Sequence, residues 1–99
     1  MNLEAKIETL KQIGAEALVD QTLNKIIQSK LYQLTEVQAH LRQELDEFEQ
    51  RYGLSSEECW KHFEAGTLGD DADYFEWSGI YEVYQSNETT LQRLRANLK

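Results

Sequence analysis

The sequence predicts an all-α fold, a long antiparallel helical hairpin with a short helix at the bend and an N-terminal helical arm. The 99 residues include no proline, which permits long uninterrupted helices. Apolar residues recur at spacings of three and four, whereas no tract of alternating β-branched residues suggests a strand. The length fits a single domain over residues 1–99 with only a modest core.

The N-terminal arm is predicted from apolar residues at positions 3, 7, 10 and 13, which lie on one face of a helix from Leu3 to Ile13. Gly14 then weakens the helix without having to end it. Two alternatives stay open at this point: the arm continues into the next helix, or it folds back as a separate element.

A long helix is predicted from about 17 to 52, which would be roughly 50 Å long. Gly53 is suited to the left-handed position that follows a helix. From residue 31 the apolar residues approach a heptad seam: Leu31, Leu34, Val37, Leu41, Leu45, Phe48 and Tyr52. This seam has two interpretations, because it could pack against another helix of the same chain or join two chains in a coiled coil.

The segment after Gly53 carries the signals of a new helix N-terminus. Ser55 and Glu58 fit a capping box, and Leu54 and Cys59 fit a hydrophobic staple. We therefore expect a short helix over about 56–65, ended by Gly66 and followed by a glycine turn over 66–69.

The last helix is predicted over about 71–97. Its first turn is acidic, as the helix dipole favours, and its apolar face is Tyr74, Trp77, Ile80, Tyr81, Tyr84, Leu91, Leu94 and Leu98. The short helix and the glycine turn let the chain reverse, so the long and last helices should pair antiparallel. The long helix should still leave apolar surface uncovered near residues 3–27.

Charge and aromatic residues concentrate at the bend. The net charge is -8, but residues 1–43 hold five acids and five bases, whereas residues 44–88 hold thirteen acids and two bases. Nine of the ten aromatic residues lie between Phe48 and Tyr84. Such a region could form an interface that steers a basic protein onto aromatic anchors. Alternatively, the aromatic residues fill the core and the acids keep the surface solvated.

The candidate partner-binding residues come from the N-terminal part of the last helix: Asp70, Asp71, Asp73, Tyr74, Glu76, Trp77 and Tyr81. We expect a basic protein as the partner, together with homo-oligomerisation through the long helix. Direct nucleic-acid binding is not expected, because clustered Lys and Arg are missing from the sequence.

No catalytic residue, cofactor or metal site is expected, and the chain is predicted not to be an enzyme. The acids at 70–76 do not follow a calcium-loop spacing, and a helix N-terminus explains them more simply. Cys59 and His62 are three residues apart but have no evident orienting group, so we expect Cys59 to pack in the core. No phosphate loop or dinucleotide fingerprint occurs.

The cellular location is predicted to be cytoplasmic. A single cysteine cannot form an internal disulfide, which fits a reducing compartment. The N-terminus has no apolar run of signal-peptide length, and no stretch approaches the roughly 20 apolar residues that span a bilayer. Contact with a membrane is therefore not expected.

Three stretches resemble a family of small acidic bacterial and archaeal antitoxin-like proteins, often encoded beside a toxin. They lie at 19–25, 48–58 and 66–77, and the most specific is Leu-Gly-Asp-Asp-x-Asp-x-Phe-Glu-Trp over 68–77. The resemblance covers about residues 19–84. It implies a helical protein that neutralises a toxin, commonly an RNA-cleaving one, which would be basic because its substrate is anionic.

An acidic, aromatic surface would then compete with RNA for such a toxin. The sequence shows no helix-turn-helix and no basic arm, so the resemblance does not extend to the DNA-binding modules of many antitoxins. The alternative function is a self-associating helical scaffold or adaptor that uses the seam of the long helix.

Overall fold

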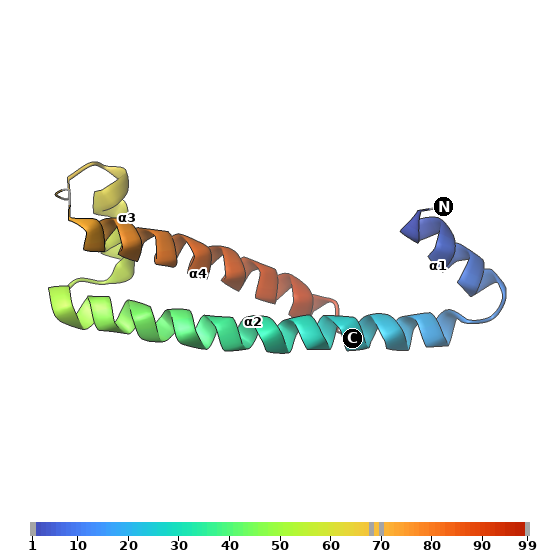
Figure 1. Cartoon of the computed structure of the whole chain (residues 1–99). Helices are drawn as coiled ribbons and strands as arrows, with labels where there is room; N and C mark the ends of the chain where they lie inside the picture. The colour runs from blue at the N-terminus through green and yellow to red at the C-terminus, as the bar shows by residue number, and fades with distance from the viewer. Residues whose placement is uncertain (1, 68, 70, 99) are drawn as a thin grey trace.

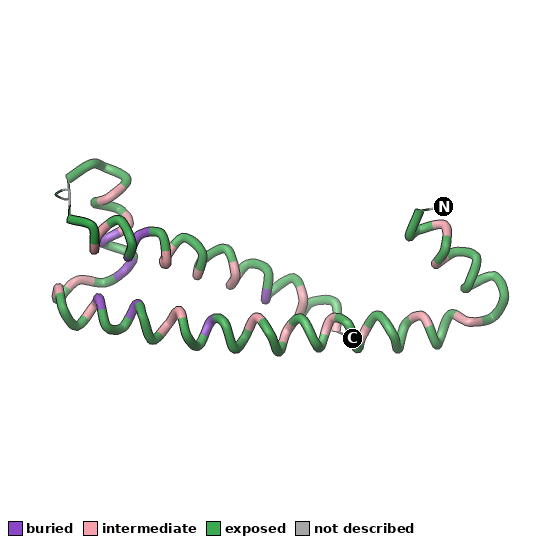
Figure 2. The backbone as a smooth tube through the Cα atoms, viewed as in Figure 1, coloured by how far each residue is buried: buried purple, intermediate pink, exposed green. Residues whose placement is uncertain are grey.

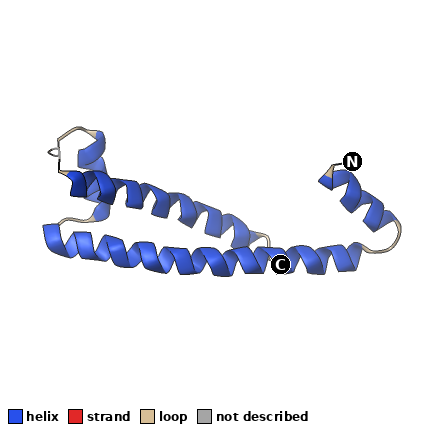
Figure 3. Ribbon diagram, in the orientation of Figure 1, coloured by secondary structure: helices blue, strands red, loops and turns tan. Residues whose placement is uncertain are grey.

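The computed structural model describes residues 2–67, 69 and 71–98, and this part of the chain is built from helices without strands. In chain order the helices are α1 (Leu3–Gln12), α2 (Glu16–Tyr52), α3 (Ser56–Glu64) and α4 (Ala72–Ala96). Helix α4 returns alongside α2, and α3 lies at the bend between them (Figures 1 and 3). The predicted all-α hairpin with a short helix at the bend and an N-terminal arm is confirmed.

The N-terminal arm is a separate helix, which decides between the two alternatives left open. The side chain of Asn2 caps α1 by accepting a hydrogen bond from the amide of Ala5 at 2.8 Å. Gly14, at φ +89, adopts a left-handed conformation that interrupts the helix. Helix α1 therefore turns back toward the start of α2 (Figure 1).

The bend begins and ends with local capping interactions. Gly53 lies in the left-handed region at φ +65, and its amide donates to the carbonyl of Glu49 at 2.9 Å, which closes α2. Ser55 then caps α3 by accepting from the amide of Glu58 at 3.1 Å. Both helix ends lie where the sequence predicted them, because short-range hydrogen bonds decide them.

The main core lies at the bend, where α2, α3 and α4 meet. Its buried residues are Leu45, Phe48, Cys59 and Trp77, and Leu91 is buried farther along α4. The rings of Phe48 and Trp77 stack with centroids 5.6 Å apart and an interplanar angle of 10°. Figure 2 shows the buried positions of the backbone gathered toward this end of the molecule.

The hairpin seam contains a polar layer at Gln38, which corrects the predicted seam. Val37 is 45 % exposed, whereas Gln38 is 5 % exposed. With Gln38 in place of Val37, the seam steps alternate strictly between three and four residues from Leu31 to Tyr52. A rule that admits only apolar residues to the seam overlooked this position.

The side-chain amide of Gln38 makes three hydrogen bonds to α4. Its amide nitrogen donates to the carbonyl of Tyr84 at 3.1 Å and to Glu88 Oε1 at 2.9 Å. Its amide oxygen accepts from Asn87 Nδ2 at 3.0 Å. Because an unpaired buried amide is costly, these bonds favour one register of α4 along α2.

The molecule is elongated, with principal extents of 62 × 23 × 18 Å. Its radius of gyration is 19.8 Å, against roughly 13 Å for a compact domain of this length. The cause is a mismatch in helix length: α2 has 37 residues and α4 has 25. The described helices include none that is long and apolar enough to cross a membrane.

Candidate functional site

A chain of hydrogen bonds holds the three helices together beneath the bend. Trp77 Nε1 donates to Ser56 Oγ at 2.8 Å, and Ser56 Oγ donates to Glu49 Oε2 at 2.7 Å. The amide of Ser56 donates to the same oxygen at 2.9 Å, and Arg42 donates to the other oxygen of Glu49 at 2.8 Å. The N-terminal part of α4 is thereby fixed against α2 and α3.

The pKa of Glu49 reflects this position. Partial burial alone would raise the pKa, but the hydrogen bonds from Ser56 and the charge of Arg42 outweigh burial and lower it below its ordinary 4.5. Glu49 is therefore a charged structural residue, and the sequence patterns did not distinguish it from the many acids around it.

The expectation that Trp77 contacts a partner is wrong for this fold. Its side chain is 0 % exposed and stacks on Phe48, and its single N–H group donates to Ser56. The acidic and aromatic stretch around Trp77 suggested an interface. In the fold, however, the indole of Trp77 is buried where α2, α3 and α4 meet. Trp77 therefore fixes α4 against α2 and α3 and is not part of the molecular surface.

Tyr74 and Tyr81 lie at the boundary between core and surface. Both are half-buried, with Tyr74 against the ring of Tyr52 at 5.1 Å and Tyr81 against the ring of Trp60 at 6.4 Å. Each therefore presents only part of its side chain to solvent.

Among the predicted acids, Asp70 lies outside the described residues. Asp71 is the exposed N-cap of α4 and accepts from the amide of Asp73 at 2.9 Å. Asp73 accepts from the hydroxyl of Tyr52 and from Arg51 at 3.2 Å. The hydrogen bond to Asp73 raises the pKa of Tyr52 to about 12.

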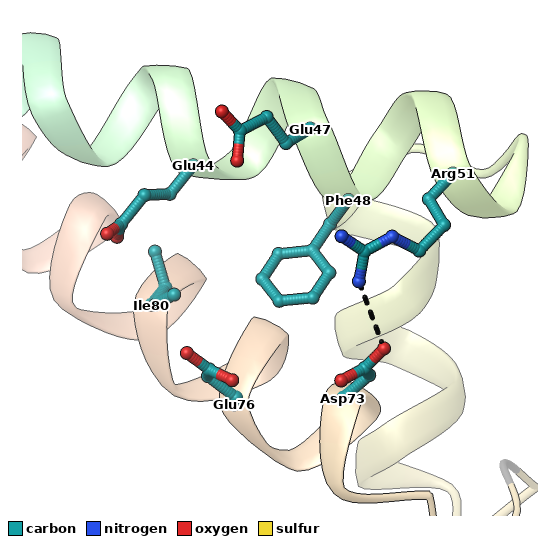
Figure 4. Close-up of a pocket in the computed structure, with 7 residues that line it drawn as sticks. All are labelled: Glu44, Glu47, Phe48, Arg51, Asp73, Glu76 and Ile80. Carbon is teal, nitrogen blue, oxygen red and sulfur yellow. Dashed lines mark hydrogen bonds and ion pairs between the residues drawn. The ribbon is translucent and has the colours of Figure 1, made fainter.

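Asp73 and Glu76 line an acidic groove between α2 and α4. We define this groove by Glu44, Glu47, Phe48, Arg51, Asp73, Glu76 and Ile80. Figure 4 shows the carboxylates of Glu44 and Glu76 projecting from the two helices, with Arg51 directed at Asp73. Four carboxylates and one guanidinium give the groove a formal charge of -3.

The sequence predicted two of these acids and missed Glu44 and Glu47. They lie one turn apart on α2, and only the antiparallel register of the hairpin brings them opposite Glu76. Their pairing across helices leaves no local signal in the sequence.

Phe75 is the most exposed aromatic side chain beside the groove, at 72 %. It meets Phe63 of α3 edge to face, with centroids 6.0 Å apart, and the hollow around them also includes Gly69, Asp71 and Ala72. Ala72 and Glu76 are one turn apart on α4, so the hollow and the acidic groove adjoin. We call them together the bend surface.

Phe75 was not among the predicted contacts, although its position carried a signal. It falls outside the apolar spacing that Tyr74, Trp77 and Tyr81 follow. An aromatic residue off the buried stripe of a helix is expected to face solvent.

The described residues contain no group of three or more His, Cys, Asp or Glu side chains suited to a metal ion. Cys59 is buried as predicted, and its sulfur lies 3.8 Å from Ser78 Oγ. Burial raises the pKa of the Cys59 thiol, which opposes formation of the nucleophilic thiolate. His62 instead hydrogen-bonds Thr67 at 2.9 Å.

Comparisons of the chain with protein-family models, curated proteins and solved structures find no match.

Proposed function

We propose that the protein is a non-enzymatic binding module whose bend surface captures a basic protein. The observation that carries this proposal is the adjacency of the acidic groove and the exposed ring of Phe75. An aromatic anchor beside like-charged carboxylates is a combination that binds a basic, partly apolar surface.

Electrostatics support this choice of partner. The groove carries a formal charge of -3 within a region, residues 44–88, whose net charge is -11. Glu44, Glu47 and Glu76 have no ion pair among the residues that the structure describes. A Lys or Arg side chain of a partner would supply the missing charge, and the wider field would accelerate its approach.

The specific form of the proposal is antitoxin-like inhibition of a basic, RNA-cleaving toxin. It is supported by the resemblance of residues 19–84 to small acidic antitoxin-like proteins. Its physical basis is that a surface which binds RNA phosphates also attracts carboxylates. The inhibitor would then occupy the surface that the toxin uses for RNA.

The binding proposal is tested with tagged protein incubated in its native lysate over a series of salt concentrations. We expect one basic protein to be retained at low salt and weakened at high salt, because screening reduces attraction between exposed charges. The triple variant Glu44→Gln, Glu47→Gln and Glu76→Gln should lose this protein. Phe75→Ala should weaken its retention at every salt concentration.

The matched control is Glu4→Gln, Glu8→Gln and Glu36→Gln, which removes the same charge from exposed positions outside the bend. It should retain the partner as the unmodified chain does. Equal losses of partner retention in the two triple variants would show that binding depends on net charge alone. Undiminished retention by the bend variant would overturn the proposed surface.

The antitoxin form is tested with the captured protein after purification. It should cleave RNA alone, and the unmodified chain should inhibit cleavage more strongly than the bend triple variant. A captured protein without RNA-cleaving activity would overturn this form and leave the binding module in place.

A further inference from the structure

The end of the molecule opposite the bend exposes an unusual amount of apolar surface. Six of the ten large hydrophobic side chains that are exposed among the described residues lie in the first 26 positions. They are Leu3, Leu10, Ile13, Leu18, Leu23 and Ile26, and we call them the arm face. Helix α1 contributes no buried residue to the chain's own core.

The arm face continues onto α2 as a regular stripe. Exposed Leu23, Ile26 and Val37 lie along α2 at steps of three and four residues, with the polar Lys30 and Gln33 between Ile26 and Val37. Residues 30, 33 and 37 border a mainly apolar groove against α4 that Leu34 and Leu94 also line. A second apolar hollow lies between α1 and α2, around Leu10, Ala15, Leu18 and Leu23.

The exposed area is larger than a compact monomer would leave. The chain has 7374 Å² of accessible surface, whereas a compact protein of 11.6 kDa exposes roughly 5,800 Å². The excess is about 1,500 Å², and a standard interface covers about 800 Å² on each partner. The surplus is therefore sufficient for a stable dimer.

The charge distribution favours a second copy of this chain as the occupant. Residues 1–43 hold five acids and five bases, and the end of α4 that lies beside them adds Arg93 and Arg95, so repulsion between two arm regions is weak. Residues 44–88 carry a net charge of -11, so two bends would repel each other. Contact through the arms, with the bends at opposite ends, would bury the exposed apolar side chains of the arm face and keep the acidic regions apart.

We propose that the arm face, together with its stripe on α2, is the interface of a two-fold homodimer whose acidic bends point away from each other. This proposal does not rest on the function proposed for the bend. A two-fold interface places the same patch of both chains in contact, and the neutral arm face satisfies that condition. Each dimer would then present two bend surfaces at its ends.

The oligomeric state is measured by light scattering and sedimentation over a range of micromolar concentrations, with small-angle scattering for the shape. We expect twice the mass of the chain and a largest dimension well above the 62 Å of one copy. The thermal midpoint should rise with protein concentration, because dimerisation stabilises the folded chain by mass action.

A matched pair of variants locates the interface. Ile26 is 52 % exposed on the stripe and Val83 is 50 % exposed on α4, outside it. Ile26→Glu should raise the dissociation constant roughly thirtyfold or more, whereas Val83→Glu should leave it unchanged. Leu18→Glu, at a second arm position, should weaken the dimer as Ile26→Glu does.

A monomer at every concentration, with a thermal midpoint that does not depend on concentration, would overturn the proposal. So would a dimer that Val83→Glu disrupts and the two arm variants do not. A dimer whose largest dimension stays near 62 Å would place the two chains side by side and exclude the arrangement with separated bends.

Discussion

The two ends of α2 belong to one continuous helix, but one end is buried by other helices and the other is exposed to solvent. At its C-terminal end, Leu45 is 0 % exposed beneath α3 and α4; at its N-terminal end, Leu18 is 65 % exposed beside α1. Both are leucines on a continuous helix, so helix propensity does not separate them. The difference is whether another helix returns over them, and α4 is too short to reach the first turns of α2.

An apolar stripe in the sequence predicts that a helix face will be buried, but it does not predict which element will cover that face. At the bend the chain itself satisfies that need, and hydrogen bonds through Ser56, Glu49 and Gln38 fix the arrangement. At the arm the stripe stays uncovered within one chain.

The largest loss is expected from Trp77→Ala, because it removes the largest fully buried side chain and leaves Ser56 without its donor. We expect a destabilisation of about 3–5 kcal/mol, measured by urea unfolding. Phe75→Ala, two residues away and 72 % exposed, should change stability by less than about 0.5 kcal/mol. Comparable losses in the two variants would contradict the assignment of Trp77 to the core and Phe75 to the surface.

Glu49→Gln should cost roughly 1.5–3 kcal/mol at neutral pH, since it removes a charged acceptor from Ser56 and Arg42. The pKa of Glu49 is lowered in the folded protein, so its charge stabilises the fold above the ordinary value of 4.5. That contribution is lost as the pH falls through the lowered pKa. Urea unfolding at several pH values should therefore show a flatter acid limb for Glu49→Gln.

Glu47→Gln is the control for this experiment, because Glu47 is exposed on the same helix two residues away. It should preserve both the stability at neutral pH and the steepness of the acid limb. An acid limb identical in the unmodified chain and in Glu49→Gln would show that Glu49 does not contribute to the pH dependence.

Gln38→Ala should destabilise the hairpin by about 1–3 kcal/mol, because the partly buried carbonyl of Tyr84 and the side chains of Asn87 and Glu88 lose a partner. Val37→Ala, at the neighbouring exposed position, should cost less. Urea unfolding compares the two variants directly. A larger loss of stability in Val37→Ala than in Gln38→Ala would contradict the polar layer and support the seam through Val37 that the sequence predicted.

The smallest change in stability is expected from removing the helix caps, and it should differ between the two ends of the molecule. Ser55→Ala removes the cap of α3 inside the cooperative core and should cost about 1 kcal/mol in global unfolding. Asn2→Ala removes the cap of α1, which buries no residue, and should leave global unfolding of the dilute chain unchanged. Circular dichroism during thermal unfolding measures both, and equal shifts would show that α1 unfolds with the core.

Local signals account for the parts of the fold that the sequence predicted well. The end of α2 at Gly53, the cap at Ser55 and the acidic start of α4 each depend on residues within about one turn. The site was harder to predict. Asp73 and Glu76 were identified, but Glu44 and Glu47 join them only through the pairing of α2 with α4.

Apolar spacing, helix caps and composition are local properties, so the amino-acid sequence was enough to predict the helices, the reversal of the chain and the acidic, aromatic character of the bend. The folded chain was needed to show that Trp77 is buried while Phe75 is exposed, that Gln38 rather than Val37 enters the seam, and that α1 folds back at Gly14. These outcomes depend on which helix faces which and how far each extends. That choice is made by packing between residues far apart in the chain.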